Sequence, residues 1–152
     1  MFTNCYCTQF RRAANSLTSI YDRELRPVGL KITQFSMLRA LERLGSATYT
    51  ELSKEAALDK TTISRSLKLL VEAGWVSITN ESDARFKVAS LSLEGISKLR
   101  HAEEYWIVAQ REVEREFQCV LVEPVDVGLL KALETIQHAG RVAEEESEKA
   151  PL

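Results

Sequence analysis

One capped amphipathic segment, residues 59–74, most constrains what this chain can fold into. Asp59 is placed to accept the free N–H groups of a first helical turn, and Gly74 suits the position just past a helix end. The side that carries small hydroxyls also carries Arg65 and Lys68, as a helix that reads a DNA groove requires. Considered alone, the segment also fits an ordinary amphipathic surface helix. Apolar residues at helical spacing predict the face that packs on a core: Ile63, Leu67, Leu70 and Val71.

A second short helix is predicted directly before this segment. Thr50 can cap it, which places Leu52 and Ala56 on its inward face. Only Ala57 and Leu58 separate its end from the next cap. Two short helices with so short a connection must cross steeply, so the pattern predicts a helix-turn-helix, although the turn lacks the glycine often found there.

Two runs with strand periodicity follow, residues 75–79 and 86–91, and a polar loop separates them. They predict a β-hairpin, or wing, with Arg85 at its tip and Lys87 on its solvent side. Basic side chains there can enter a minor groove or hold phosphates. The alternative is a solvated hairpin with an incidental arginine. The order helix, turn, helix and hairpin within one short stretch favours the wing.

The stretch from Leu52 to Gly95 resembles the MarR family of winged helix-turn-helix transcriptional regulators. The wing loop is short against the usual family pattern, and Ile78 stands where the family commonly carries an arginine. The matching pieces are Asp59-Lys-Thr-Thr-Ile-Ser-Arg65, Gly74-Trp-Val76, Asp83-Ala-Arg85 and Leu91-Ser-Leu-Glu-Gly95, with Leu25-Arg-Pro-Val-Gly-Leu30 and Thr33-Gln-Phe-Ser-Met-Leu38 upstream.

The resemblance implies a mainly α fold with a small β-hairpin wing, in a single MarR-like domain over residues 1–152. Within it, residues 33–91 are expected to form the winged DNA-binding lobe. Residues 1–30 and 92–148 are expected to form a helical dimerisation region. The implied function is a homodimeric regulator of double-stranded DNA, most often a repressor.

Helical periodicity predicts the flanking helices independently. They cover about residues 5–25, 33–44, 93–117 and 125–148, with Thr33 and Ser92 as caps of the second and third. The first helix and the last two are too long and apolar to stay in water on one small domain, which predicts a dimer interface. The alternative is a monomer with a closed helical core. A two-fold dimer would read a pseudo-palindromic site with half-sites about one helical turn apart.

The DNA contacts are predicted from these placements. In the major groove we expect bases or flanking phosphates to be contacted by Thr61, Thr62, Ser64 and Arg65. Phosphate contacts are expected from Thr50, Lys60 and Lys68. Arg85, held by Asp83, is expected to serve the wing together with Lys87.

Charge and composition agree with this prediction. The net charge is −2, but residues 1–48 hold seven Arg and Lys against three Asp and Glu, while residues 101–152 hold five against twelve. A locally basic face is therefore compatible with a slightly acidic chain. No signal peptide is evident at the N-terminus, and three cysteines cannot all pair within one chain, so a reducing cytoplasm is expected.

Two cysteines are candidates for redox sensing. With Asn4 as a cap, Cys5 and Cys7 would lie in the first turn of the first helix, where the helix dipole lowers a thiol pKa. Cys7 resembles in position the peroxide-sensing cysteine of one MarR branch, but Ile32 and Phe35 replace the tyrosines that accompany it there. The alternative is a packed or inert thiol. Residues two apart do not share a helix face, so no metal clamp is expected from this pair.

A small-molecule effector site is implied by the same resemblance. Such ligands bind between the dimer helices and the winged lobe, and an aromatic cleft with one cation suits an aromatic carboxylate. The alternative is that the aromatic residues are simply core. The residues expected to line the site are Phe10, Arg11, Phe35, Leu38 and Trp106.

No enzyme is predicted. The two histidines, His101 and His138, have no metal-ligand spacing, and no phosphate-binding or nucleophile motif is present. No cofactor is expected. A winged helix used only for protein contact remains the alternative function, but it would not need Arg65, Lys68 and Arg85 together.

Overall fold

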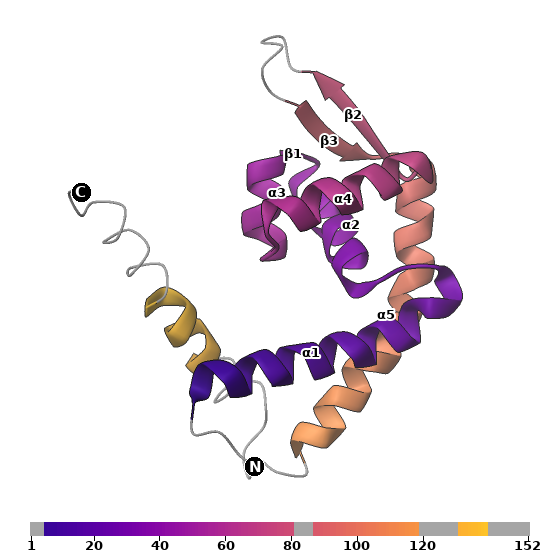
Figure 1. The fold of residues 1–152 in the computed structure, drawn as a ribbon. Coiled ribbons are helices and arrows are strands. Elements are labelled where there is room, and N and C mark those ends of the chain that lie inside the picture. The colour runs from indigo at the N-terminus through magenta and orange to yellow at the C-terminus, as the bar shows by residue number, and fades with distance from the viewer. Residues whose placement is uncertain (1–4, 81–86, 119–130, 140–152) are drawn as a thin grey trace, which may run out of the picture. The chain divides into compact units, whose positions relative to one another are not determined.

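The computed structural model describes residues 5–80, 87–118 and 131–139. It confirms a mainly α fold with a small sheet, in the order shown in Figure 1. The chain forms two compact units, residues 1–110 and 111–152, and in the second unit residues 131–139 are helical. The remainder of the helix predicted over residues 125–148 lies outside the described residues. None of the helices in the described ranges is long and apolar enough to cross a bilayer.

A segment that contains a proline and a glycine separates the first two helices. Helix α1 spans Tyr6–Leu25, the 3-10 turn η1 spans Arg26–Val28, and helix α2 spans Ile32–Leu44. Gly29 follows the turn with a φ of 67°, a left-handed conformation that glycine adopts without a Cβ clash. The proline in η1 stands at one of its first positions, where its missing N–H removes no helical hydrogen bond.

The predicted cap of α2 is wrong. The helix begins at Ile32, so Thr33 lies inside its first turn, and Lys31 occupies the N-cap position. Asp22 on α1 accepts the N–H of Ile32 at 2.7 Å, and the side chain of Gln34 accepts the N–H of Lys31 at 2.9 Å. A tertiary acceptor on α1 thus satisfies the first N–H of α2, which local sequence patterns do not predict.

The cap of the next helix is also two residues earlier than predicted. Helix α3 spans Tyr49–Ala56, and Thr50 lies within its first turn. Thr48 accepts the N–H of Glu51 at 3.3 Å, while the Glu51 carboxylate accepts the Thr48 N–H at 2.7 Å. This reciprocal arrangement is a capping box, and its pattern of threonine followed three residues later by glutamate is readable in the sequence.

The helix-turn-helix forms as predicted. Helix α4 spans Lys60–Glu72 with Asp59 as its N-cap. Ala57 in the connecting turn adopts a φ of 52°, the left-handed conformation that glycine usually supplies. The turn therefore forms without the expected glycine, and an alanine adopts the left-handed backbone conformation that is unfavourable for residues with a Cβ.

The inward face of α4 is mostly the one predicted. Ile63, Leu67 and Leu70 are fully buried. Val71 was expected to join them, but its exposed fraction is 38%. Ser66 is buried in its place because it lies closer to the centre of the stripe that Ile63 and Leu70 define.

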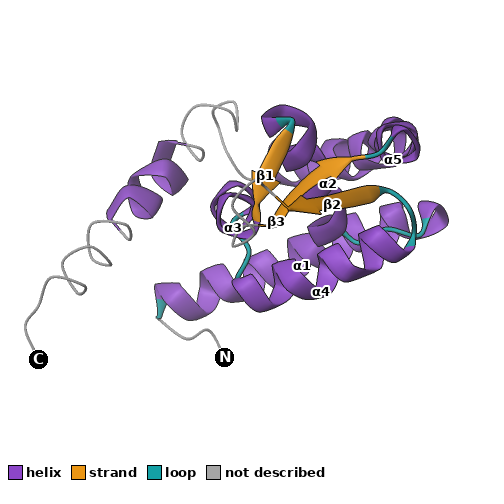
Figure 2. Cartoon of the chain, turned by 90° about the horizontal axis from the view of Figure 1, so that it is seen from above, coloured by secondary structure: helices purple, strands orange, loops and turns teal. Residues whose placement is uncertain are grey.

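The sheet has three strands rather than the predicted two. Strands β2 (Val76–Asn80) and β3 (Lys87–Leu91) form the antiparallel hairpin, and β1 (Ser46–Thr48) pairs with the other edge of β3. Figure 2 shows the strands side by side in the order β1-β3-β2. Three residues are too few for strand periodicity to reveal β1. Ala47 lies opposite Ala89 in this pairing, and both are buried.

The recognition lobe joins the last long helix through a close backbone contact. Helix α5 spans Leu93–Gln118, and Ser92 caps it by accepting the N–H of Gly95 at 2.9 Å. The Ser92 hydroxyl also donates to the carbonyl of Gly74 at 2.7 Å. A Cβ on Gly95 would lie 2.0 Å from the Trp75 carbonyl oxygen, so only glycine fits this contact.

The core of this unit gathers one face from each element. Helix α2 is its centre, because five of its residues are buried. The largest fully buried side chains are Phe35, Leu25, Met37, Leu38, Leu41, Leu52, Ile63, Leu67, Leu70 and Leu99.

Gly95→Ala is expected to destabilise the protein by about 1–3 kcal/mol, as overpacked sites do. Helix propensity alone predicts the opposite sign, a gain of about 1 kcal/mol for alanine. The free energy of unfolding measured in urea distinguishes these two expectations. Ser97→Ala, on the exposed side of the same helix, is the control and should be neutral or slightly stabilising. A Gly95→Ala protein as stable as wild type would contradict the close contact.

Candidate nucleic-acid interface

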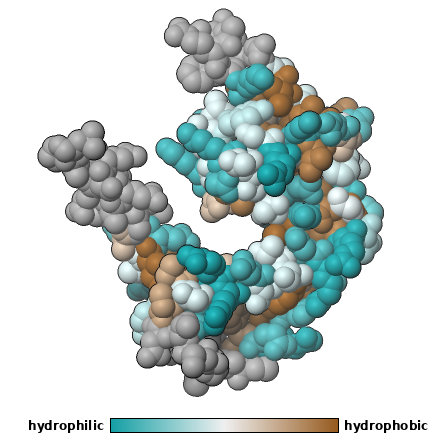
Figure 3. Space-filling model, viewed as in Figure 1, coloured by the Kyte–Doolittle hydropathy of each residue, from teal (hydrophilic) through white to brown (hydrophobic). Residues whose placement is uncertain are grey.

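The exposed side of α4 carries most of the predicted DNA contacts. The side chains of Thr61, Ser64, Arg65 and Lys68 are exposed, opposite the buried stripe. In Figure 3 hydrophilic and intermediate residues lie beside apolar patches on the described part of this lobe. Within the described part of the chain no ion pair engages Arg65, whereas Lys68 lies 4.0 Å from Glu72 in a highly exposed pair. Such a surface pair is weak, so both cations are available to an anionic partner.

The start of α4 is held by its cap. Asp59 accepts the N–H of Thr62 at 2.9 Å and the hydroxyl proton of Thr62 at 2.5 Å. The hydroxyl and N–H of Thr62 together lower the pKa of the Asp59 carboxyl below its ordinary value. The Thr62 hydroxyl is therefore committed as a donor, which leaves its oxygen only as an acceptor towards DNA.

The remaining predicted contacts lie on three elements. Lys60 begins α4, Thr50 is on the first turn of α3, and Lys87 begins β3; all three are exposed. Asp83 and Arg85 of the wing tip lie outside the described residues. The structure thus brings the helix-turn-helix residues into one lobe but leaves the wing contact a prediction.

A groove runs between the start of α2 and the side of α4, and we call it the α2–α4 groove. Its volume is about 220 Å3. It includes Thr62 and Arg65, which were predicted, and cationic and polar residues of α2, which were not. Its full lining is Lys31, Thr33, Gln34, Thr62, Arg65, Ser66 and Leu69.

Known proteins share this sequence and fold. A MarR family model matches residues 28–85. The chain is 32% identical to the transcriptional regulator MosR of M. tuberculosis, solved in complex with DNA, with 93% of this chain and 98% of that chain covered and a TM-score of 0.73. It is 26% identical over 110 residues to YwoH of Bacillus subtilis, an uncharacterised HTH-type transcriptional regulator, covering 72% of this chain and 80% of YwoH. The chain belongs to the MarR family.

A more distant solved structure supports the fold alone. BpsR of Bordetella bronchiseptica, whose DNA binding is regulated by 6-hydroxynicotinic acid, is 17% identical; 90% of this chain and 96% of that chain are covered, with a TM-score of 0.78. As a MarR-family protein, this chain is a DNA-binding transcriptional regulator and not an enzyme. Among the described residues, no cluster of His, Cys, Asp and Glu is suited to hold a metal ion.

A pocket of about 560 Å3 opens between α2, α3 and α5, and we call it the α2 pocket. Of the predicted effector residues it contains Phe35 and Trp106. Leu38 is fully buried and does not line it, and Phe10 lies on α1 with an exposed fraction of 46%. Arg11 instead donates to the sulfur of Cys7 at 3.6 Å.

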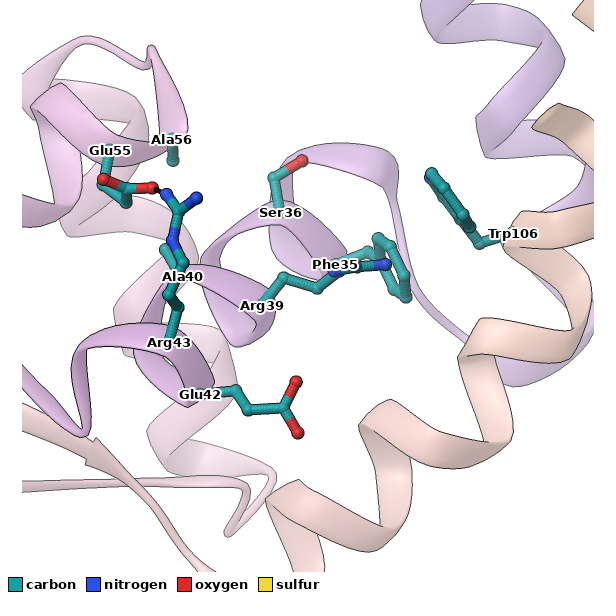
Figure 4. A pocket seen from close by; sticks show the side chains of 9 residues that line it. All are labelled: Phe35, Ser36, Arg39, Ala40, Glu42, Arg43, Glu55, Ala56 and Trp106. Atoms are coloured by element: carbon teal, nitrogen blue, oxygen red, sulfur yellow. Dashed lines mark ion pairs between the residues drawn. The ribbon is translucent and has the colours of Figure 1, made fainter. Parts of the chain in front are cut away.

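Two arginines line the α2 pocket, and Arg39 is the one that lies against its aromatic rings. Its guanidinium lies 5.8 Å from the centre of the Phe35 ring and 5.1 Å from that of Trp106, and the two rings stack at 5.9 Å. Figure 4 shows Trp106 across from Phe35, with the Arg43–Glu55 ion pair at another side. Sequence reasoning missed Arg39, although its position one turn after Phe35 could have suggested it.

The predicted thiol site lies at the start of α1. Cys5 is itself the N-cap residue, rather than part of the first turn behind an Asn4 cap, and both Cys5 and Cys7 are exposed. Hydrogen bonds from the side chain and backbone of Thr8 lower the pKa of the Cys5 thiol. A larger thiolate fraction of Cys5 at neutral pH follows, which favours its reaction with an oxidant.

Proposed function

We propose that this MarR-family protein is a homodimeric repressor that reads a pseudo-palindromic operator through α4. The observation that carries the proposal is the exposed face of α4, where Arg65 has no intramolecular ion pair among the described residues. Arginine in this position suits bidentate binding to guanine. The face also includes Thr61, Thr62 and Ser64. Lys60, Lys68 and Thr50 flank it as phosphate contacts, and Arg85, held by Asp83, serves the wing with Lys87.

The homodimer is supported by apolar side chains that remain at the surface of α1 and α5. Tyr6 and Phe10 on α1 have exposed fractions of 81% and 46%, and Ile107 and Val108 on α5 have 41% and 52%. Apolar surface of this kind marks an interaction site. A two-fold partner would cover it and would set two α4 helices about 34 Å apart.

Arg65→Ala is expected to weaken operator binding by about 1–3 kcal/mol while the dimer remains intact.

The first experiment is capture and sequencing of sheared genomic DNA by the purified protein, with an Arg65→Ala/Arg85→Ala protein as control. Enrichment of a short pseudo-palindrome that the control loses supports the proposal, and the enriched duplex then serves to measure the Arg65→Ala loss. Equal enrichment by both proteins would show that α4 and the wing do not recognise the DNA sequence through Arg65 and Arg85. No enrichment at low salt would favour the protein-contact alternative.

We further propose that an aromatic carboxylate binds in the α2 pocket and releases the DNA. Arg39 lies against two stacked rings and can pair with a carboxylate while the rings receive the ligand's aromatic plane. BpsR, with the same fold, responds to an aromatic acid of this type. A ligand bound against α2 would favour one position of the DNA-binding helices over another. It releases DNA only if it binds the DNA-free conformation more tightly than the DNA-bound one.

Arg39→Gln is expected to weaken binding of 6-hydroxynicotinic acid or benzoate more than tenfold, because a charge-assisted hydrogen bond contributes about 1.5–3 kcal/mol. Quenching of tryptophan fluorescence reports the binding through Trp106. Arg12→Gln, on the exposed surface of α1, is the matched control and should bind as wild type does. Cyclohexanecarboxylate has the carboxylate but no aromatic ring, so its affinity tests the contribution of ring stacking to binding. Equal affinities of the Arg39→Gln and wild-type proteins for both aromatic acids would exclude Arg39 as the anchor.

A second mode of release is oxidation of the Cys5 and Cys7 pair. The Cys5 thiolate attacks one oxygen of a peroxide, the O–O bond breaks, and the sulfur becomes a sulfenic acid while hydroxide leaves and is protonated to water. The depressed pKa of Cys5 and the Arg11 contact at Cys7 support this proposal.

Mild peroxide is expected to weaken operator binding of the wild-type protein and not of a Cys5→Ser/Cys7→Ser protein, which retains Cys119 as an internal control. Thr8→Val should slow the reaction at pH 7, because it raises the pKa of Cys5 towards the ordinary thiol value of about 8.5. Operator binding measured as a function of the time of exposure to peroxide tests both the loss of binding and its rate. If the single variant Cys7→Ser responds as wild type does, Cys7 has no part in sensing; if the double variant does so, the redox proposal fails.

A further inference from the structure

The α2–α4 groove has the composition of a phosphate site. Two cations, Lys31 and Arg65, face it from opposite sides, and the hydroxyls of Thr33 and Ser66 can donate into it, whereas the Thr62 hydroxyl already donates to Asp59. No carboxylate lines it. Lys31 and Arg65 are exposed, and in the described part of the chain neither forms an ion pair.

The α2 side of the groove is held in place by hydrogen bonds that leave the Lys31 ammonium free to bind. The backbone N–H of Lys31 donates to Gln34, and the next N–H donates to Asp22. The Asp22 carboxylate of α1 is engaged with the backbone N–H of Ile32 in this turn. The lysine therefore projects from an ordered turn, which reduces the entropy lost when it binds.

The groove is continuous with the base-reading face, because Thr62 and Arg65 belong to both. A helix inserted in the major groove has a sugar–phosphate backbone along each side. We propose that the α2–α4 groove receives one backbone phosphate of the operator, with Lys31 and Thr33 as its ligands beside Arg65. This inference rests on the proposed function of α4, and it extends the DNA surface onto a helix outside the helix-turn-helix.

Lys31→Gln tests the inference, since it keeps the length of the side chain and leaves the backbone cap intact. Binding is measured by fluorescence anisotropy over a range of NaCl, with the captured operator duplex and with a scrambled duplex of the same composition. Loss of one phosphate contact should weaken binding to both duplexes by about fivefold near 0.15 M salt and should reduce the salt slope by about 1. Thr33→Val should give a smaller loss in the same direction.

Lys131→Gln, at an exposed lysine of the second unit, is the matched control and should leave affinity and slope unchanged. Equal melting temperatures of all variants confirm that they are folded. If Lys31→Gln keeps the wild-type slope while Arg65→Ala loses the operator, the reading role of α4 stands and the phosphate site is wrong. If neither variant changes binding, the proposed function itself fails.

Two further outcomes would overturn the inference. A loss on the operator alone, with no change on the scrambled duplex, would make Lys31 a base-reading residue. Stabilisation of wild type by inorganic phosphate at constant ionic strength, absent in Lys31→Gln, combined with unchanged DNA binding, would make the groove a site for a free anion.

Discussion

The burial of one stripe of α4 determines which side chains of this helix face outwards towards DNA. Ile63, Leu67 and Leu70 are fully buried, and each contributes about 1.5–3 kcal/mol by leaving water. Rotation of α4 by one residue position would expose part of this stripe and move an arginine towards the core. Burial of an unpaired charge is more costly than any gain available on the exposed face. The rotation of α4, and hence the outward direction of Arg65, is therefore fixed by packing.

Helix α2 provides the surface against which that stripe packs, and it also lines both recesses of the lobe. Its inward side supplies Phe35, Met37 and Leu38 to the core. Its first turn lines the α2–α4 groove, and its later turns line the α2 pocket beside Arg39. A dense core transmits displacement because its side chains have no free volume to absorb it. A ligand that shifts α2 at the pocket would therefore also shift the groove, which gives one physical route from an effector to DNA.

Polar contacts refine this arrangement rather than create it. Ion pairs join α2 to its neighbours, Arg43 with Glu55 on α3 and Glu42 with Arg100 on α5. Their side chains are partly exposed, so each adds little stability and chiefly selects one relative position of the helices. The contact of Gly95 with the Trp75 carbonyl is more restrictive, because no side chain can be accommodated there. It explains in physical terms why a glycine stands in the first turn of α5.

Local chemistry in the sequence was sufficient to predict the elements whose signals are short-range. The Asp59 cap, the apolar stripe of α4 and the Ser92 cap depend on residues within one to three helical turns of each other, and the hairpin joins two strands that are neighbours in the chain. The tertiary structure alone decided features with distant partners. Asp22 on α1 accepts the first N–H of α2 from Ile32, ten residues later in the chain. Strand β1 exists only through its pairing with β3, and Arg39 became a pocket residue through Trp106, far along the chain. Val71 was misassigned because helical spacing gives the direction of a face but not its width, which depends on what packs against it.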